Sequence, residues 1–84
     1  MDHGREKKIL KEFGERLKKI RTDKNLSTRA LADLAEMDFG NINEIENGKT
    51  NPSLVTIIAL AEALGIQSVD LLPHKKWATF WWPF

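Results

Sequence analysis

The chain contains no cysteine, and none of its apolar runs approaches the length of a membrane span. Without cysteine, disulfide bonds and thiolate metal sites are excluded. A bilayer-spanning helix needs about 20 apolar residues, so no membrane partner is expected. The first eight residues, MDHGREKK, also lack the apolar region of a secretory signal. Together these absences predict a cytoplasmic protein.

Patterns that carry catalysis or bind cofactors are also missing. His3 and His74 lie far apart in the sequence, and no cluster of Asp, Glu or Cys surrounds either of them. The sequence shows no Ser/His/Asp arrangement, no glycine-rich phosphate loop and no paired-carboxylate site. We therefore expect no enzyme activity, no metal and no cofactor.

What the sequence does have is an uneven distribution of charge along 84 residues, a length that suits one small domain. Residues 1–29 hold ten of the thirteen Lys and Arg residues and five acids, whereas residues 30–49 hold five acids and Lys49. A basic segment can be an electrostatic footprint for phosphate or a solvated helix face. Charge alone favours the solvated face.

The spacing of apolar residues predicts helices throughout. Between Glu6 and Lys24 it follows the pattern of a one-sided helix, and Gly14 inside this helix suggests close approach by another helix. Ser27 and Asp38 are predicted N-caps of a second and a third helix, and Gly48 ends the third in a left-handed conformation. The apolar stripe of the first helix consists of Ile9, Leu10, Phe13, Leu17 and Ile20.

A fourth helix is predicted after Asn51-Pro52-Ser53, capped at its end by Gly65. Ser68 is the predicted N-cap of a last short helix that Pro73 stops. No stretch alternates as a strand would, so we predict five helices and an all-α fold. The predicted buried stripe of the fourth helix consists of Leu54, Ile57, Ile58, Ala61 and Leu64.

Three segments follow: an N-terminal arm over residues 1–8, a helical domain over 9–72 and a C-terminal tail over 73–84. Large aromatic residues left in water are an aggregation liability. The tail is therefore interpreted as a surface for packing between subunits. Folding back over the core, a disordered end, a cloning remnant or a membrane-interface role would also fit its composition. Its candidate dimerisation residues are Trp77, Phe80, Trp81, Trp82 and Phe84.

The second and third helices have the features of a helix-turn-helix pair. Small residues at Ala32 and Ala35 permit a tight crossing, and Ile42 and Ile45 anchor the third helix to the core. The opposite face then points outward, where Asn pairs with adenine edges, Glu accepts from the cytosine amino group and Phe contacts a thymine methyl. The predicted base-reading residues are Phe39, Gly40, Asn43 and Glu44.

An ordered set of motifs across residues 9–72 resembles the phage repressor and Cro-like (XRE) family of helix-turn-helix transcriptional regulators. The set includes FGERLKKIR at 13–21, Leu26-Ser27, Leu31-Ala32, IENGK at 45–49, NPSL at 51–54 and Ala61 through Gly65-Ile66. The resemblance implies a five-helix, lambda-repressor-like DNA-binding domain. It also implies an ion pair between Arg21 and Glu46 that ties the first helix to the end of the reading helix.

In such proteins the start of the second helix and the loop after the third hold phosphates, which here implies Ser27, Thr28, Arg29, Asn47, Lys49 and Thr50. Two departures stand out. Glu36 occupies the turn position where the family usually has glycine, which makes this turn strained. The reading surface carries Asp38 and Glu44 and no base-facing cation, and acidic groups near phosphate weaken non-specific attraction.

The expected function is sequence-specific binding of double-stranded DNA by a transcriptional regulator of the repressor type. One such module makes few contacts, so we expect a homodimer on a palindromic operator with half-sites about 34 Å apart. The alternative is a protein-binding module, such as an antitoxin, whose partner is held by the aromatic tail or the acidic face.

Overall fold

The computed structural model describes residues 2–73. Within these residues, four α-helices and one 3-10 helix follow each other: α1 (His3–Asp23), α2 (Thr28–Ala35), α3 (Phe39–Glu46), α4 (Leu54–Leu64) and η1 (Ser68–Leu71). The described residues include no strand, in agreement with the predicted all-α fold. In this part of the chain, no helix combines the length and the apolar character that crossing a membrane requires.

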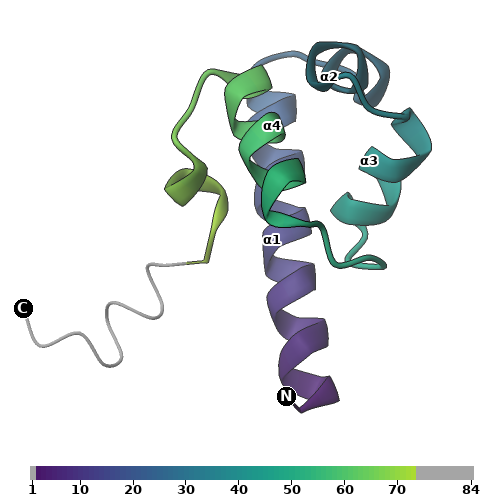
Figure 1. Ribbon diagram of the computed structural model, residues 1–84, viewed down its shortest axis with the longest axis vertical. Helices are drawn as coiled ribbons and strands as arrows, with labels where there is room; N and C mark the ends of the chain where they lie inside the picture. Colours follow the sequence, from purple (N-terminus) through teal and green to yellow (C-terminus); the bar gives the residue numbers. More distant parts are fainter. Residues whose placement is uncertain (1, 74–84) are drawn as a thin grey trace, which may run out of the picture.

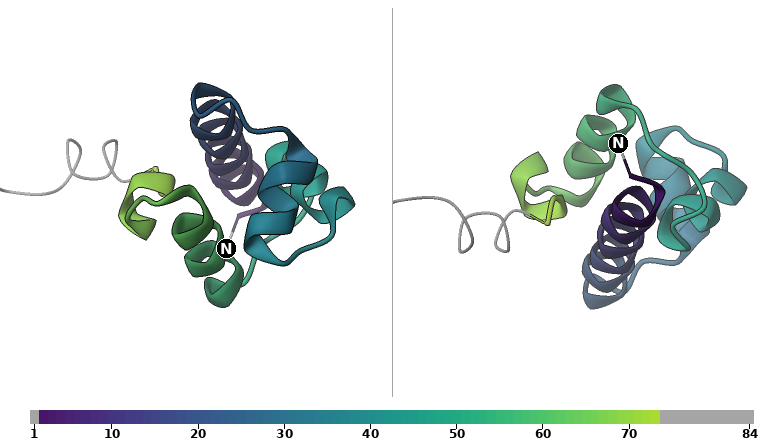
Figure 2. Two further views of the ribbon diagram at one scale, coloured as in Figure 1. Left: turned by 90° about the horizontal axis from the view of Figure 1, so that it is seen from above. Right: turned by 90° about the horizontal axis from the view of Figure 1, so that it is seen from below.

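The helices α1 and α4 occupy the middle of the molecule, with η1 on one side and the α2–α3 pair on the other (Figures 1 and 2). Side chains from all five elements meet between them and form one core. Arg16 of α1 donates a hydrogen bond to the carbonyl of Asp70, which ties α1 to η1. The largest fully buried side chains are those of Leu17, Leu31, Ile42, Ile45, Leu60 and Leu71.

Side-chain caps fix where α2 and α4 begin. The hydroxyl of Ser27 accepts a hydrogen bond from the Ala30 amide at 3.0 Å, and the hydroxyl of Ser53 accepts one from Thr56 at 3.1 Å. Each cap pairs an amide that the first helical turn would otherwise leave without a partner. Gly48 and Gly65 adopt the predicted left-handed conformation, with φ of 70° and 68°.

The first helix begins earlier than predicted. It starts at His3, after Asp2, whose carboxylate accepts a hydrogen bond from the Gly4 amide at 3.0 Å. Most of the predicted arm over residues 1–8 is therefore part of α1, and its first turns project past the loop that joins α3 to α4 (Figure 1).

The predicted buried stripe of α4 was wrong at two positions. Leu54 is 71% exposed and Ile58 is 42% exposed, whereas the core takes Leu60, which the prediction omitted, together with Ala61 and Leu64. Because α4 is apolar on nearly every side, periodicity alone does not determine which stripe faces the core.

The last element also differs from its prediction. It is a four-residue 3-10 helix, and its N-cap is Gln67 rather than Ser68. The Asp70 carboxylate accepts a hydrogen bond from the backbone amide of Gln67 at 3.3 Å, so it pairs the amide of the N-cap residue itself. The predicted dimerisation residues of the tail lie outside the described residues: Trp77, Phe80, Trp81, Trp82 and Phe84.

Candidate nucleic-acid interface

A tight turn joins α2 to α3. Glu36 adopts the left-handed conformation with φ 56° and ψ 47°, which the family's usual glycine would adopt more easily. The Met37 amide then donates to the Ala32 carbonyl at 2.8 Å, and the Glu36 amide donates to the Asp33 carbonyl at 3.3 Å. These bonds pair the end of α2 and turn the chain directly into α3.

The inner face of the α2–α3 pair is buried as predicted. Ala32 is buried in α2, Ala35 packs partly buried against the core, and Ile42 and Ile45 of α3 are almost completely inaccessible to solvent. Burial of the two isoleucines fixes the rotation of α3 about its axis. The opposite side of α3 is therefore held toward solvent, at the edge of the molecule away from η1 (Figure 1).

This outward side carries the predicted base-reading residues. Asn43 and Glu44 are exposed, Phe39 is 38% exposed, and Gly40 is half-buried. Within residues 2–73, neither the Asn43 nor the Glu44 side chain makes a hydrogen bond or an ion pair. Their polar groups are available to an external partner.

A contact that the sequence did not predict joins the two helices at this surface. The guanidinium of Arg29, in the first turn of α2, lies 4.2 Å from the centre of the Phe39 ring at the start of α3. A guanidinium over an aromatic face is attracted by the ring quadrupole. The contact therefore places a cation beside α3, although α3 itself carries no Lys or Arg.

The predicted phosphate-binding residues lie at both ends of α3. Ser27, Thr28 and Arg29 belong to the start of α2, and Arg29 lies over the ring of Phe39 at the start of α3. Lys49 and Thr50 belong to the loop after α3, and Lys49 is exposed. Asn47 ends α3, and its side-chain amide donates to the Asn43 carbonyl at 2.9 Å, so one of its two amide hydrogens is already used.

A buried ion pair holds the end of α3 against α1. The Nε of Arg21 lies 2.6 Å from Oε2 of Glu46, and a second guanidinium nitrogen donates to Oε1 at 3.1 Å. The third nitrogen donates to the Leu26 carbonyl at 2.7 Å, just before α2. The two side chains are only 9% and 5% exposed. This bidentate pair thus fixes α1, α3 and the segment before α2 together.

Gly14 explains how α1 comes close enough for that pair. A Cβ added at Gly14 would lie 2.5 Å from the Glu46 carbonyl oxygen and would also overlap the carbonyl of Ile45. Real Cβ atoms do not approach a backbone oxygen this closely. The close helix approach predicted for Gly14 is therefore its contact with α3.

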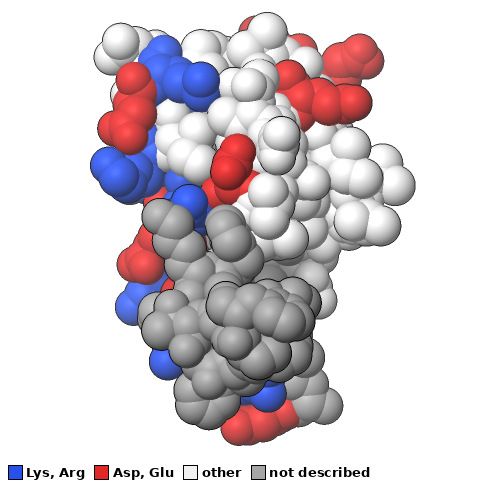
Figure 3. All heavy atoms as spheres, turned by 90° about the vertical axis from the view of Figure 1, so that its left-hand side faces the viewer, with Lys and Arg blue, Asp and Glu red and all other residues white. Residues whose placement is uncertain are grey.

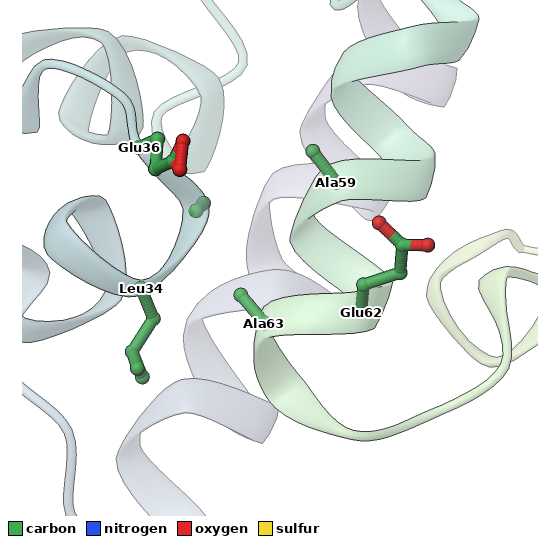
Figure 4. Close-up of a pocket in the computed structure, with 6 residues that line it drawn as sticks. Leu34, Glu36, Ala59, Glu62 and Ala63 are labelled. Carbon is green, nitrogen blue, oxygen red and sulfur yellow. The ribbon is translucent and has the colours of Figure 1, made fainter.

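An open groove lies between α2 and α4. It has a volume of about 430 Å³, and the carboxylates of Glu36 and Glu62 extend from its two sides (Figure 4). The remaining lining is apolar: Leu34, Ala35, Ala59 and Ala63. Carboxylates repel phosphate, so this groove does not belong to the candidate nucleic-acid interface.

An apolar face lies on α4 and η1. We define the apolar face as Leu54, Val55, Ile58, Val69 and Leu72, all of which are large apolar residues with exposed side chains. Seen from the side of η1, uncharged side chains cover much of the described surface, acidic side chains lie near its centre and at the upper right, and basic and acidic side chains alternate along the left edge (Figure 3). Exposed apolar clusters of this kind mark surfaces of association.

Comparison with known proteins agrees with this geometry. Residues 17–71 match the helix-turn-helix family HTH_3. The transcriptional regulator DdrOP3 of Deinococcus deserti is 38% identical over 58 residues, which make up 69% of this chain and 45% of that protein. Control protein C.MunI of a Mycoplasma species is 40% identical over 60 residues, 70% of this chain and 81% of that protein.

A solved structure shows the same fold. The restriction-modification controller protein C.AhdI from Aeromonas hydrophila is 43% identical, with a TM-score of 0.74 over 75% of this chain and 96% of that one. The chain spans less than half of DdrOP3 but most of the two control proteins. These matches show that the chain belongs to the helix-turn-helix family that includes the phage repressor and Cro-like (XRE) regulators.

Proposed function

We propose that this protein binds double-stranded DNA sequence-specifically through α3 and regulates transcription as a repressor. The observation that carries the proposal is the outward face of α3. It presents Asn43 and Glu44 to solvent while Ile42 and Ile45 anchor the same helix in the core. A helix held in this way fits the major groove, where amide and carboxylate groups distinguish base edges.

Phosphate-binding groups at both ends of α3 support this docking. The exposed Lys49 follows the helix, and the start of α2, with Arg29, lies beside its beginning. Contacts with the phosphates of the two DNA strands would fix the position of α3 in the groove, while contacts with the base edges supply the sequence preference. Such a regulator acts where prokaryotic DNA lies, in the cytoplasm.

The test is selection of bound duplexes from a random pool by the wild type and by three variants. Asn43→Ala and Glu44→Ala should change the selected sequence more than the affinity. Lys49→Ala should weaken binding to all sequences and reduce the slope of log K against log salt by about 1 for each bound subunit. If Glu44→Ala selected the same duplex sequences as the wild type, Glu44 would not read a base. Failure of the wild type to bind any duplex at low salt would contradict the whole proposal.

The regulator is further proposed to act as a homodimer in which two apolar faces meet. A two-fold axis would make this contact isologous and would pair two α3 helices on a palindromic operator, about 34 Å apart. Val55, at 76% exposed, is the most exposed member of the face and can be changed with little effect on the fold.

Val55→Glu should therefore convert the dimer to a monomer in sedimentation and weaken binding to a full palindrome. Leu34→Glu is the matched control, because Leu34 is also an exposed apolar residue, at 56%, but lies on α2 outside the face. Deletion of residues 77–84, which contain Trp77, Phe80, Trp81, Trp82 and Phe84, tests whether the tail contributes. If Val55→Glu and Leu34→Glu sediment identically to the wild type, the apolar face is not the dimer contact.

The same apolar face supports a second candidate, a protein-binding module of the antitoxin type. In that case a different protein, rather than a second copy, would cover Leu54 and Val55. A wild type that stays monomeric at high concentration, and binds DNA only weakly, would favour this alternative over the homodimer.

A further inference from the structure

The first helix extends beyond the domain on the side of the phosphate-binding loop. From His3 to about Lys11, α1 projects past the segment that joins α3 to α4 (Figure 1). The loop itself touches α1 at the base of this projection. A Cβ added at Gly48 would lie 3.1 Å from the Cα of Lys11, so the backbone just before Lys49 rests on α1 at that residue.

Helical periodicity shows which side of the projection faces the same way as α3. Residues advance by about 100° around an α-helix. Gly14 and Arg21 both point toward α3, as their contacts with the end of that helix establish. Lys7 lies about 20° from the direction of Gly14, and Lys11 lies about 60° from it on the same side.

We define the α1 stripe as Lys7 and Lys11, which are both exposed. Glu6 and Glu15 lie about 100° and 80° from Lys7 around the helix, and Asp2 and Glu12 lie farther still. Glu15 follows Lys11 by one turn, about 40° from it, and marks where the stripe ends toward the rest of the domain. Between Lys7 and Lys11 the stripe is cationic, and it lies beside the loop that carries Lys49.

We propose that the α1 stripe binds backbone phosphates of the duplex just outside the base pairs that α3 reads. This inference rests on the proposed function, because it extends the phosphate contacts of the α3–α4 loop. When Lys49 contacts a phosphate, the sugar-phosphate backbone of the DNA passes the point where Gly48 touches Lys11. Lys7 then lies about 6 Å farther along α1, at about 1.5 Å per residue. That advance matches the rise of about two base pairs along one strand, at about 3.4 Å each.

Charge complementarity identifies the occupant as nucleic acid backbone. The backbone contact between Gly48 and Lys11 brings the segments that carry Lys11 and Lys49 together, and an anion bound between two cations relieves their repulsion. Because lysine contacts phosphate without reading bases, the α1 stripe adds affinity and salt dependence but no sequence preference.

The test compares two lengths of duplex. One ends at the outermost base pair of the selected operator, and the other carries about four more base pairs of arbitrary sequence on each side. The wild type should bind the longer duplex more tightly and with a steeper salt slope. The double variant Lys7→Gln, Lys11→Gln should lose this dependence on length, its slope on the longer duplex should fall by about 2 for each bound subunit, and its selected sequence should stay the same.

The matched control is Lys8→Gln, Lys19→Gln. It removes the same charge from exposed positions of α1 that lie about 100° or more from Lys7 and about 60° and 80° from Lys11, and the exposed pair of Lys19 with Asp23 contributes little stability. The control should keep the length dependence. Equal salt slopes and equal length dependence for the two double variants would overturn the inference while leaving operator binding intact. Absence of any binding by the wild type would overturn the proposed function together with it.

Discussion

The buried pair of Arg21 and Glu46 gives a prediction whose size follows from the structure. Removing the carboxylate by Glu46→Ala leaves the guanidinium of Arg21, whose side chain is 9% exposed in the wild type, with only the Leu26 carbonyl as a partner. Removing one member of a buried ion pair costs about 3–5 kcal/mol, because the remaining charge stays buried without compensation. With so little exposure, solvent does not screen this loss.

A domain of this length has a free energy of unfolding of about 4–13 kcal/mol, from about 0.05–0.15 kcal/mol per residue. Glu46→Ala therefore removes a large share of the total stability. At about 4–8 °C per kcal/mol for a small domain, its Tm should fall by about 12 °C or more. Urea unfolding followed by far-UV circular dichroism measures the change, with an unchanged m-value as the control for two-state behaviour.

The double variant Arg21→Met, Glu46→Leu distinguishes the cost of leaving one charge buried without its partner from the cost of losing the ion pair itself. Apolar residues of similar volume avoid the stranded charge, so the double variant should be more stable than Glu46→Ala alone. It should still fall short of the wild type, because the Leu26 carbonyl loses its donor at a cost of about 1–3 kcal/mol. The double-mutant cycle should give a coupling energy above about 2 kcal/mol. Additive effects within about 0.5 kcal/mol would refute the buried bidentate pair.

Three further changes test individual features of the backbone and the reading surface. Gly14→Ala should destabilise the fold by at least about 2 kcal/mol, because its Cβ would overlap the α3 carbonyls. Gly4→Ala is the control on the same helix: its Cβ would make only an ordinary contact, so it should stabilise the fold slightly. Thermal unfolding measures both changes. Glu36→Gly should raise the free energy of unfolding by up to about 1 kcal/mol by relieving the left-handed conformation, and a loss in urea titration would contradict this. Phe39→Ala should release Arg29 from its aromatic support, which nuclear magnetic resonance would detect as faster guanidinium motion; unchanged motion would mean that the ring does not hold it.

Much of the site followed from local sequence rules. The spacing of Ile42 and Ile45 identified the inner side of α3, and therefore its outer side as well. The hydroxyl of Ser27 and the left-handed Gly48 identified where helices begin and end. These features depend on residues within a few positions of each other, so a pattern in the sequence is sufficient to predict them.

Features that depend on packing between distant segments were harder to predict. The apolar residues of α4 surround most of the helix, and only the presence of α1 and α2 determines that Leu60 is buried while Leu54 is exposed. The contact between Arg29 and Phe39 likewise depends on the crossing of α2 and α3. No local rule distinguishes an arginine stacked on a ring from one in solvent.

The distribution of charge around α3 has a consequence for how the proposed reader discriminates between sequences. Asp38 and Glu44 are exposed at the reading helix, whereas the exposed lysines flank it at Lys49 and in the α1 stripe. Acidic groups over the groove weaken attraction to every duplex alike. A cytosine amino group offsets that repulsion only where it donates to the Glu44 carboxylate. The same side chain thus lowers binding to non-operator DNA and favours the matching site, so Glu44→Gln should increase non-specific binding while reducing the ratio of specific to non-specific affinity.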